Sequence, residues 1–359
     1  MSSITRPLQS RYDVVVVGGG AAGLSAAVTL GRALRSVLVI DAGHPRNAPA
    51  AGVHGFLGRE GMNPLDLLDA GRSEARSYGA EVVVGEASLL RRHTDGFEVV
   101  LADGRRVTGR RLLVTTGLAD GLPDIAGLRE QWGHGVVHCP YCHGYEIRGQ
   151  RIGILGTGPL SVHQTLLFRQ WSDDITLFLN DTVIPTDEDW DTLAARSIRV
   201  VDGAVASVDS TAGVLTGVTL VGGTDFGLAA LAVGTRMEAR GDLLGPLGLT
   251  LQDHPSGMGR FIEAGPMGTT AVPGVYAAGN ISNVAAQVIV AAAEGTMAAA
   301  AINADLITEE TGWAVEGHHG PFSAASEAAV SERVLGLRHG LDVEPAAALS
   351  DRKEVHRAG

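Results

Sequence analysis

The chain has 359 residues, of which 45% are hydrophobic and 19% charged, so it is predicted to be a folded globular protein rather than a disordered one. Its 28 basic and 40 acidic side chains give a net charge of −12, which argues against nucleic acid or an anionic membrane surface as a partner. The most apolar stretch, 284–301, is interrupted by Gln287, Glu294, Gly295 and Thr296. We therefore expect no transmembrane helix and, without a basic-then-apolar leader, no secretion.

A strand, a glycine turn, a helix and a second strand are predicted at the start of the chain. Residues 13–17 are mostly valine, as a strand buried on both faces requires, and a helix over 24–34 and a strand over 36–40 follow. The turn between the first strand and the helix reads Gly18, Gly19, Gly20, Ala21, Ala22, Gly23. Asp41 lies 23 residues after Gly18. Such glycines let the backbone approach a pyrophosphate, and the acid can accept hydrogen bonds from a ribose, so this unit predicts a dinucleotide site.

A second unit of the same kind is predicted further along the chain. Before it, short strands are expected at 81–84, 97–101 and 111–114, with a hairpin turn at Asp103-Gly104. The second unit has a strand at 152–155, the turn Gly156-Thr157-Gly158-Pro159-Leu160-Ser161, a helix to about Trp171 and a strand at 175–179. Further strands are expected at 204–208, 214–220 and 228–233, a strand and turn at 274–280 and a long helix at 284–306.

This order predicts an α/β protein with two Rossmann-like, three-layer ββα dinucleotide-binding domains, the second inserted into the first. We place the first part of one domain at 1–121, the inserted domain at 122–242 and the rest of the first domain at 243–311. The tail, 312–359, is expected to contain a short helix over 323–335.

The two cysteines of the chain, Cys139 and Cys142, form a Cys-x-x-Cys pair flanked by His138 and His143. Zinc normally needs four ligands, and two histidines adjacent to the cysteines rarely wrap one ion, so we predict a redox pair and no metal site. Such a pair commonly has a thiol pKa below the free value, and neighbouring histidines can exchange its proton. The alternative is that one histidine is a packed polar residue. So few cysteines fit the cytoplasm.

Over about residues 12–306 the chain resembles the low-molecular-weight thioredoxin reductases, flavoproteins with an FAD domain and an inserted domain that carries Cys-x-x-Cys. The resemblance rests on both glycine turns, the cysteine pair, Thr115-Thr116-Gly117, Ala278-Gly279-Asn280, Gln287 and Gly295-Thr296-Met297-Ala298-Ala299. It implies that Cys142 is the thiol beside the flavin and Cys139 the thiol that exchanges with substrate. It also implies an FAD-binding set: Gly18, Gly20, Ala21, Ala22, Gly23, Asp41, Arg46, Asn47, His54, Thr116, Gly117, Gly279, Asn280, Ala286, Gln287 and Val288.

The chain departs from this family where NADPH would bind. The family has an acid after the second cysteine, where this chain has His143, and an arginine where this chain has Ala286. Residues 175–195 contain no Lys or Arg to hold a 2′-phosphate, and they carry five acids: Asp181, Asp187, Glu188, Asp189 and Asp191. NAD(P)H is therefore a doubtful cofactor. NADH is less excluded, because Asp181 can bind a 2′-hydroxyl.

At these points the chain is similar to a subgroup of the family, the dithiol oxidases of the gliotoxin and holomycin type. The shared features are the continuation His143-Gly144-Tyr145-Glu146, the pair Arg46-Asn47 and His54-Gly55. The resemblance implies oxidation of a dithiol to a disulfide, with FAD passing the electrons to oxygen, and His143 and His138 as base and acid.

Two alternatives to this function are kept. A nicotinamide-dependent thioredoxin reductase would use the same parts in the opposite direction, and a flavin-bound redox sensor would switch a partner through the tail. The expected partner is a small dithiol or a thioredoxin-like protein, and the resemblance implies a homodimer.

Overall fold

The computed structural model describes residues 8–319, 327–328 and 331. The chain divides into two units, Met1–Ala304 and Asp305–Gly359. The helix predicted over 323–335 lies mostly outside the described residues, although residues 327, 328 and 331 are helical. Our division of the chain into domains stays a prediction.

A seven-stranded sheet forms the centre of the first dinucleotide fold. Its strands are β1 (Arg11–Val17), β2 (Val37–Asp41), β3 (Glu81–Val84), β4 (Ala87–His93), β5 (Gly96–Leu101), β6 (Arg106–Val114) and β19 (Val275–Ala277). The order is β3-β2-β1-β6-β5-β4, and β19 pairs with β6. β1, β2, β3, β6 and β19 are parallel, whereas β4 and β5 continue the sheet as antiparallel strands. The valines of β1 are fully buried, as their β-branched run predicted.

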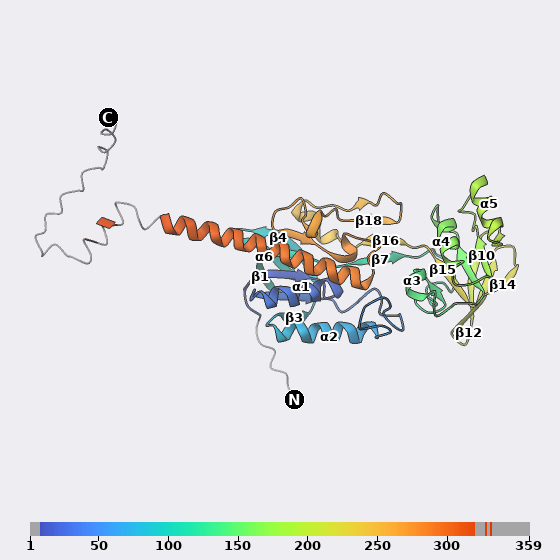
Figure 1. Cartoon of the computed structure of the whole chain (residues 1–359), viewed down its shortest axis with the longest axis horizontal. Coiled ribbons are helices and arrows are strands. Elements are labelled where there is room, and N and C mark those ends of the chain that lie inside the picture. Colours follow the sequence, from blue (N-terminus) through green and yellow to red (C-terminus); the bar gives the residue numbers. More distant parts are fainter. Residues whose placement is uncertain (1–7, 320–326, 329–330, 332–359) are drawn as a thin grey trace, which may run out of the picture. The chain divides into compact units, whose positions relative to one another are not determined.

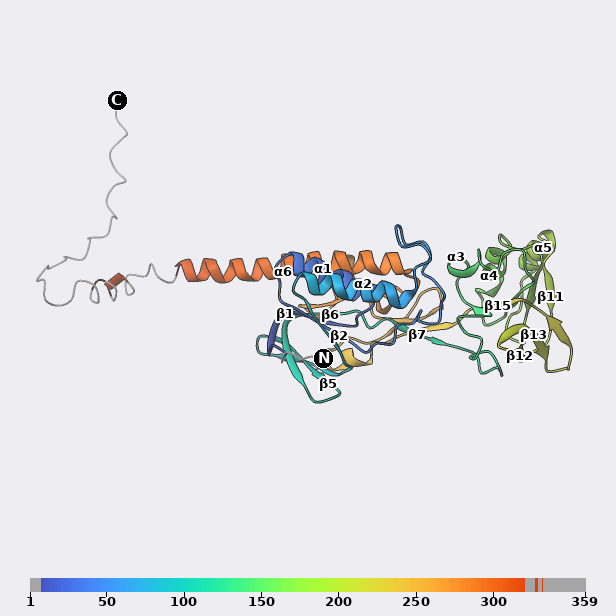
Figure 2. The same ribbon diagram turned by 90° about the horizontal axis from the view of Figure 1, so that it is seen from below.

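Three helices pack beside this sheet, and Figure 2 shows them on one face of β1, β2 and β6. They are α1 (Ala21–Arg32), α2 (Pro64–Ser77) and α6 (Val288–His319). The sequence analysis missed α2, although Asn63 accepts a hydrogen bond from the backbone of Leu65 and Pro64 occupies the first turn, both common start signals. Gly295 of α6 lies against Ala22 of α1 so closely that an added Cβ would stand 2.0 Å from the Ala22 oxygen.

The second dinucleotide fold has a five-stranded parallel sheet in the order β11-β10-β9-β15-β8. Its strands are β8 (Val136–Val137), β9 (Ile152–Leu155), β10 (Ile175–Phe178), β11 (Arg199–Val201) and β15 (Ala230–Val233). Its helices are α3 (Pro140–His143), α4 (Ser161–Phe168) and α5 (Asp187–Ala195). An antiparallel sheet of β12 (Val205–Thr211), β13 (Val214–Leu220) and β14 (Asp225–Gly227) completes it, as Figure 1 shows.

Two strands, β7 (Leu118–Gly121) and β16 (Arg236–Ala239), lead into and out of this second fold and pair with each other antiparallel. They belong to a four-stranded sheet with β17 (Gln252–Asp253) and β18 (Gly259–Phe261). The remaining elements are the 3-10 turns η1 (Asp242–Leu247), η2 (Pro266–Gly268) and η3 (Gly279–Ile281). The predicted fold class, with the second domain inserted into the first, is confirmed by this order of elements.

The acidic run that argued against NADPH has a structural role of its own in α5. Thr186 caps this helix, accepting from the Asp189 backbone while the Asp189 side chain accepts from the Thr186 backbone. Asp187, Glu188 and Asp189 fill the first turn, where the helix dipole favours negative charge. We had not predicted this helix.

The last helix differs from its predicted span of 284–306. It begins at Val288, because residues 279–286 form turns, and continues to His319. By length and composition alone, the helix over residues Val288–His318 could cross a membrane. The polar residues of the stretch 284–301 therefore do not interrupt the apolar helix as the sequence suggested. Ala298, Ala299 and Ile302 are fully buried, and the core helix of a globular domain meets the same criteria.

Candidate functional site

The first glycine turn is shaped by its own backbone contacts. Gly18 has φ +112°, and an added Cβ would stand 2.3 Å from the Thr115 oxygen. At Gly23 an added Cβ would stand 2.0 Å from the Gly18 oxygen. The Thr115 hydroxyl donates to that same oxygen over 2.8 Å. Both glycines are therefore required by the close approach of β1, α1 and the end of β6, with or without a ligand.

Gly20 differs from these two residues, because an added Cβ there would meet nothing within 4 Å. Gly20 caps α1 without a side-chain hydrogen bond, and the first N–H groups of a helix have no intrahelical partner. The turn thus leaves open space in front of a row of backbone donors at a positive helix end. A pyrophosphate fits this arrangement.

Asp41 lies beside this turn, at the end of β2. An added Cβ on Gly19 would stand 2.6 Å from the Asp41 side chain. Arg72, from the unpredicted helix α2, forms an ion pair with Asp41 over 3.1 Å, and the backbone of Gly43 donates to its other oxygen. The carboxylate is held next to the turn, where the ribose of a dinucleotide bound there would lie.

The start of α6 is fixed by an asparagine and a glutamate. Asn280 donates through Nδ2 to the backbone oxygens of Asn283, Val284 and Ala286, at 3.0, 3.3 and 2.9 Å. Glu294 accepts from the Gly279 backbone over 3.0 Å and from Asn283 over 2.7 Å. An aspartate could not donate these bonds, so the asparagine supports the loop before α6.

That loop ends at the predicted flavin-edge residues, Ala286, Gln287 and Val288. Val288 is the first residue of α6, so free backbone donors stand at this helix end. Gln287 Oε1 lies 3.8 Å from the place of a Cβ on Gly55. The structure therefore brings 286–288 next to the loop that carries His54.

The two cysteines stand at the start of the short helix α3, both partly buried and not joined by a disulfide. The hydrogen bond from the Cys142 thiol is the main cause that lowers the pKa of Cys139, from 9.0 to about 7. The backbone N–H groups of Cys142 and Tyr141 and the charge of Arg46 act in the same direction. The same thiol hydrogen bond, together with burial, raises the pKa of Cys142. The pair thus forms one thiolate, at Cys139, and one retained proton, at Cys142.

His138 is a buried imidazole with a defined orientation. Its Nδ1 lies 3.0 Å from the Val233 oxygen, and a carbonyl only accepts, so Nδ1 carries the hydrogen and Nε2 is the basic nitrogen. Burial lowers the pKa of His138. The Gln164 side chain holds the His138 backbone oxygen over 2.9 Å.

His143, the last residue of α3, is also a neutral imidazole, because burial lowers its pKa. Its Nδ1 is buried and has no hydrogen-bond partner among the described residues. The charges of Glu146 and His54 act on it. A buried nitrogen without a partner next to a dithiol is available to a thiol proton.

Arg46, predicted to bind cofactor, makes a different contact in this structure. It forms a bidentate ion pair with Asp120 of β7, with both N–O distances 2.6 Å, and Thr235 donates to the same carboxylate over 2.6 Å. Burial raises the pKa of Asp120, but the pair with Arg46 outweighs it and lowers that pKa overall. Sequence reasoning missed Asp120 and Thr235, and the Arg46-Asn47 motif gave no sign of such distant partners.

Two further predicted residues lie where β6 leads into β7. The Thr116 hydroxyl donates to the Arg240 oxygen over 2.7 Å, and the Arg240 backbone donates to the Gly117 oxygen over 2.9 Å. Gly117 has φ +70° and open space beside it. Asn47 lies in a turn closed by the Ala50 N–H, and no side-chain contact of Asn47 to the other site residues is present in the described part of the chain.

In the second glycine turn, several hydrogen-bonding groups are already engaged by other residues of the protein. The Ser161 hydroxyl accepts from the backbones of Thr157 and Gly158, at 3.0 and 3.3 Å. Pro159 has no N–H to offer. Asn180, at the end of β10, is bound on both sides, donating to the Gly156 oxygen over 3.1 Å and accepting from the Val205 backbone over 2.9 Å. Two backbone donors of the turn and both ends of the Asn180 amide are therefore engaged within the protein, and Pro159 offers no donor.

Within residues 8–319, no group of three or more His, Cys, Asp or Glu side chains converges as ligands would.

Two dinucleotide-type folds, an open glycine turn and a Cys-x-x-Cys pair together define a flavin-dependent disulfide oxidoreductase. The chain belongs to the pyridine nucleotide-disulphide oxidoreductase family, whose model matches residues 12–295. FAD is the cofactor of this thioredoxin reductase-like enzyme, and the turn at Gly20 with Asp41 fits it.

Named relatives support this assignment. "Thioredoxin reductase sirT" of Leptosphaeria maculans is 30% identical, over 82% of this chain and 94% of its own length. "Thioredoxin reductase tcpT" of Claviceps purpurea is 32% identical, over 82% and 95%. The crystal structure of HlmI superimposes with a TM-score of 0.82 at 41% identity, covering 89% of this chain and 99% of HlmI.

Proposed function

We propose that this enzyme oxidises a dithiol to a disulfide and delivers the electrons to oxygen, without a nicotinamide. The observation that carries the proposal is the second glycine turn. There, Ser161 occupies two backbone donors and Pro159 removes a third. A nicotinamide dinucleotide has little to bind there, so the cysteine pair is the remaining entry for electrons.

The first step is exchange at Cys139. In the oxidised enzyme, a substrate thiolate attacks the Cys139 sulfur of a Cys139–Cys142 disulfide, which forms a mixed disulfide and breaks the bond to Cys142. The proton of the substrate thiol passes through a neutral histidine to the departing Cys142 sulfur. The raised pKa of Cys142 supports this proton uptake.

The second step releases the product. The second substrate thiolate attacks the first substrate sulfur, which is bonded to Cys139 in the mixed disulfide. The bond to Cys139 breaks, and the Cys139 sulfur leaves with the electron pair. A leaving thiol with a pKa of about 7 departs readily near neutral pH. One dithiol has become one disulfide, and both cysteines are reduced.

The two histidines divide the proton handling in this proposal. His143 is the base, since its buried Nδ1 has no partner in the described part of the chain. His138 offers only Nε2, because the Val233 oxygen holds its Nδ1 hydrogen. Burial lowers both pKa values, so both rings are neutral and able to accept a proton at neutral pH.

FAD, when bound, supplies an acceptor for the two electrons of the thiol pair and passes them to oxygen. The residues that would hold it are those of the open turn, with Asp41 at the ribose and the backbone of 286–288 at the start of α6. The other residues of the predicted binding set keep this role as a proposal.

The test is anaerobic mixing of the yellow protein with dithiothreitol, NADH or NADPH, followed by loss of flavin absorbance. We expect bleaching by dithiothreitol alone, and return of the colour with peroxide on admitting air. Rapid bleaching by either nicotinamide would instead establish the reductase, the function after which the relatives sirT and tcpT are named.

The partner and assembly follow from the same proposal. We take the substrate to be a small dithiol rather than a thioredoxin-like protein. We take the enzyme to be cytoplasmic, because it has so few cysteines, and a homodimer, as the family resemblance implies. Light scattering of the purified protein tests the dimer. Turnover with dithiothreitol but not with reduced thioredoxin tests the partner.

A further inference from the structure

The loop after β2 carries a histidine and a glutamate that the proposed mechanism does not use. His54 Nδ1 and Glu60 Oε1 are 2.6 Å apart, and the Gly55 backbone donates to Glu60 Oε2 over 2.9 Å. The loop is closed on itself by hydrogen bonds between Val53 and Met62 and from Gly61 to Val53. Both oxygens of Glu60 are thus engaged, and the His54 ring is fixed.

This contact also sets which ring nitrogen of His54 faces the rest of the site. The Glu60 carboxylate accepts the Nδ1 hydrogen, and the hydrogen bond from His54 is the main cause that lowers the pKa of Glu60. Nε2 is then the nitrogen free to take or give a proton. That nitrogen lies 3.8 Å from Glu146 Oε1.

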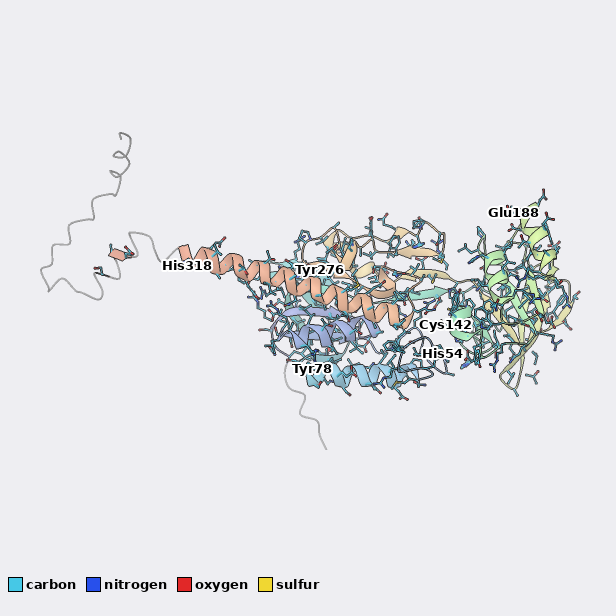
Figure 3. The ribbon with its side chains drawn as sticks, in the orientation of Figure 1. His54, Tyr78, Cys142, Glu188, Tyr276 and His318 are labelled. Atoms are coloured by element: carbon cyan, nitrogen blue, oxygen red, sulfur yellow. The ribbon has the colours of Figure 1, made fainter. Side chains whose placement is uncertain are left out.

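Glu146 connects this pair to the redox helix. It stands three residues after His143, just beyond α3, and the charges of Glu146 and His54 both act on His143. In the order Glu146, His54, Glu60 the exposed fractions of the side chains are 46%, 25% and 67%, so a carboxylate that reaches water stands on each side of the less exposed imidazole. Figure 3 shows His54 and Cys142 in the same part of the molecule, away from Glu188 on α5.

We propose that Glu146, His54 and Glu60 form a proton relay between the buried His143 and solvent. The proposal rests on the proposed function. Each dithiol oxidised gives up two protons with its two electrons. In the proposed first step one proton passes to the Cys142 sulfur, and the proton of the second substrate thiol is left on the base, which must lose it before the next turnover. His143 is buried, whereas Glu60 and Glu146 reach water, and His54 stands between the two carboxylates.

In this proposal, His54 and the two glutamates are positioning and relay residues, not catalytic ones. Glu60 has the part that a carboxylate plays behind many histidines, because it accepts the Nδ1 hydrogen and so fixes the tautomer and orientation of the ring. The competing explanation is that the contact between His54 and Glu60 only holds the loop in place and transfers no proton. The two explanations differ in whether a small diffusible base can replace the His54 ring.

The experiment measures the rate constant of anaerobic flavin reduction by dithiothreitol. We expect His54→Ala to be slower by at least ~10-fold, as for loss of an acid–base group, and added imidazole to restore part of that rate. Glu60→Gln and Glu146→Gln are expected to be slower by a few-fold and insensitive to imidazole. FAD content, from the absorbance spectrum, checks that each variant is folded and loaded.

Matched controls are His93→Ala and Glu188→Gln, on β4 and in the first turn of α5. Both are expected to keep the parent rate with or without imidazole. A fully loaded His54→Ala at the parent rate, or a slow one that imidazole leaves unchanged, overturns the relay.

Cys142→Ser separates this proposal from the proposed function. If Cys142→Ser still supports flavin reduction by dithiothreitol, the dithiol mechanism itself is wrong. If Cys142→Ser is inactive while His54→Ala is unaffected, only the relay is wrong.

Discussion

The two glycine turns of this protein share a framework but differ in what they offer a ligand. In both, the first glycine is fixed by packing, since an added Cβ would stand 2.3 Å from the Thr115 oxygen at Gly18 and 2.5 Å from the Leu179 oxygen at Gly156. In both, the second glycine, Gly20 or Gly158, has nothing within 4 Å of an added Cβ. Only in the second turn does a side chain, Ser161, occupy the backbone donors.

The difference shows that two turns with the same glycine framework can differ in which backbone donors stay open to a ligand. Close strand–helix packing demands the first glycine whether or not a ligand is present. The donors, in contrast, depend on single residues such as Ser161 and Pro159. A glycine motif by itself therefore reports the fold more securely than the cofactor.

The largest effect is expected where the first turn is packed most closely. In Gly23→Ala the new methyl would stand 2.0 Å from the Gly18 oxygen and 2.7 Å from the Thr115 hydroxyl. We expect a loss of about 3 kcal/mol in the free energy of unfolding, and loss of bound FAD. Urea unfolding and the flavin spectrum measure both, with Gly158→Ala as the control that should change neither.

The next prediction tests whether electrons enter at the cysteines rather than at the second turn. Because the Cys142 hydrogen bond lowers the pKa of Cys139 to about 7, its thiolate should persist down to neutral pH and be lost as the pH falls further. We expect the reduced protein to be alkylated at Cys139 with half-maximal rate near pH 7. At that pH Cys139 should carry roughly 50-fold more thiolate than a thiol of pKa 9, and it should react faster by less than that factor, because a thiolate of lower pKa is a weaker nucleophile.

Mass spectrometry of the alkylated peptide locates the site, and Cys142→Ala, which has no side-chain donor, serves as the comparison. Removing the donor thiol should move the profile of Cys139 to higher pH. Preferential labelling of Cys142 would reverse the assignment of the two sulfurs.

A smaller effect, on FAD affinity, is expected to distinguish Gly20 of the first turn from Gly158 of the second. Gly20→Ala should fold normally, because the methyl has room, but that methyl would occupy the space left for the pyrophosphate. We expect FAD affinity to fall by at least ~10-fold, about 1.4 kcal/mol, with the free energy of unfolding of the apoprotein almost unchanged. Titration of apoprotein with FAD measures it, and equal affinity in Gly20→Ala and Gly158→Ala would break the comparison.

The smallest effect is expected from opening the second turn. Ser161→Ala removes the acceptor for the Thr157 and Gly158 N–H groups, so we expect about 1 kcal/mol of lost stability. Oxidation of dithiothreitol should continue at the parent rate. Equilibrium dialysis with NADH then shows whether the freed donors hold a nucleotide, and binding equally tight in the parent protein would contradict a closed turn.

The sequence by itself determined the local features of this protein. The valine run and glycines of 13–23 predicted β1, the turn and α1, because strand and helix periods and backbone freedom are encoded over a few neighbouring residues. Cys139, Cys142 and their flanking histidines were also visible, since all four lie within the six residues 138–143. The signals for the start of α2, Asn63 and Pro64, are equally local, so this helix was predictable from the sequence although we did not predict it.

Only the tertiary structure decided how those features are used. Arg46 pairs with Asp120, 74 residues away, and His54 faces Glu146 from another part of the chain, and no local pattern encodes such partners. The direction of the Ser161 hydroxyl likewise depends on how the turn folds back on α4. The sequence predicted the redox pair and the two glycine turns. Long-range contacts decided the partners of Arg46 and His54, and burial lowered the pKa values of His138 and His143, because charge, burial and hydrogen bonding act through space rather than along the chain.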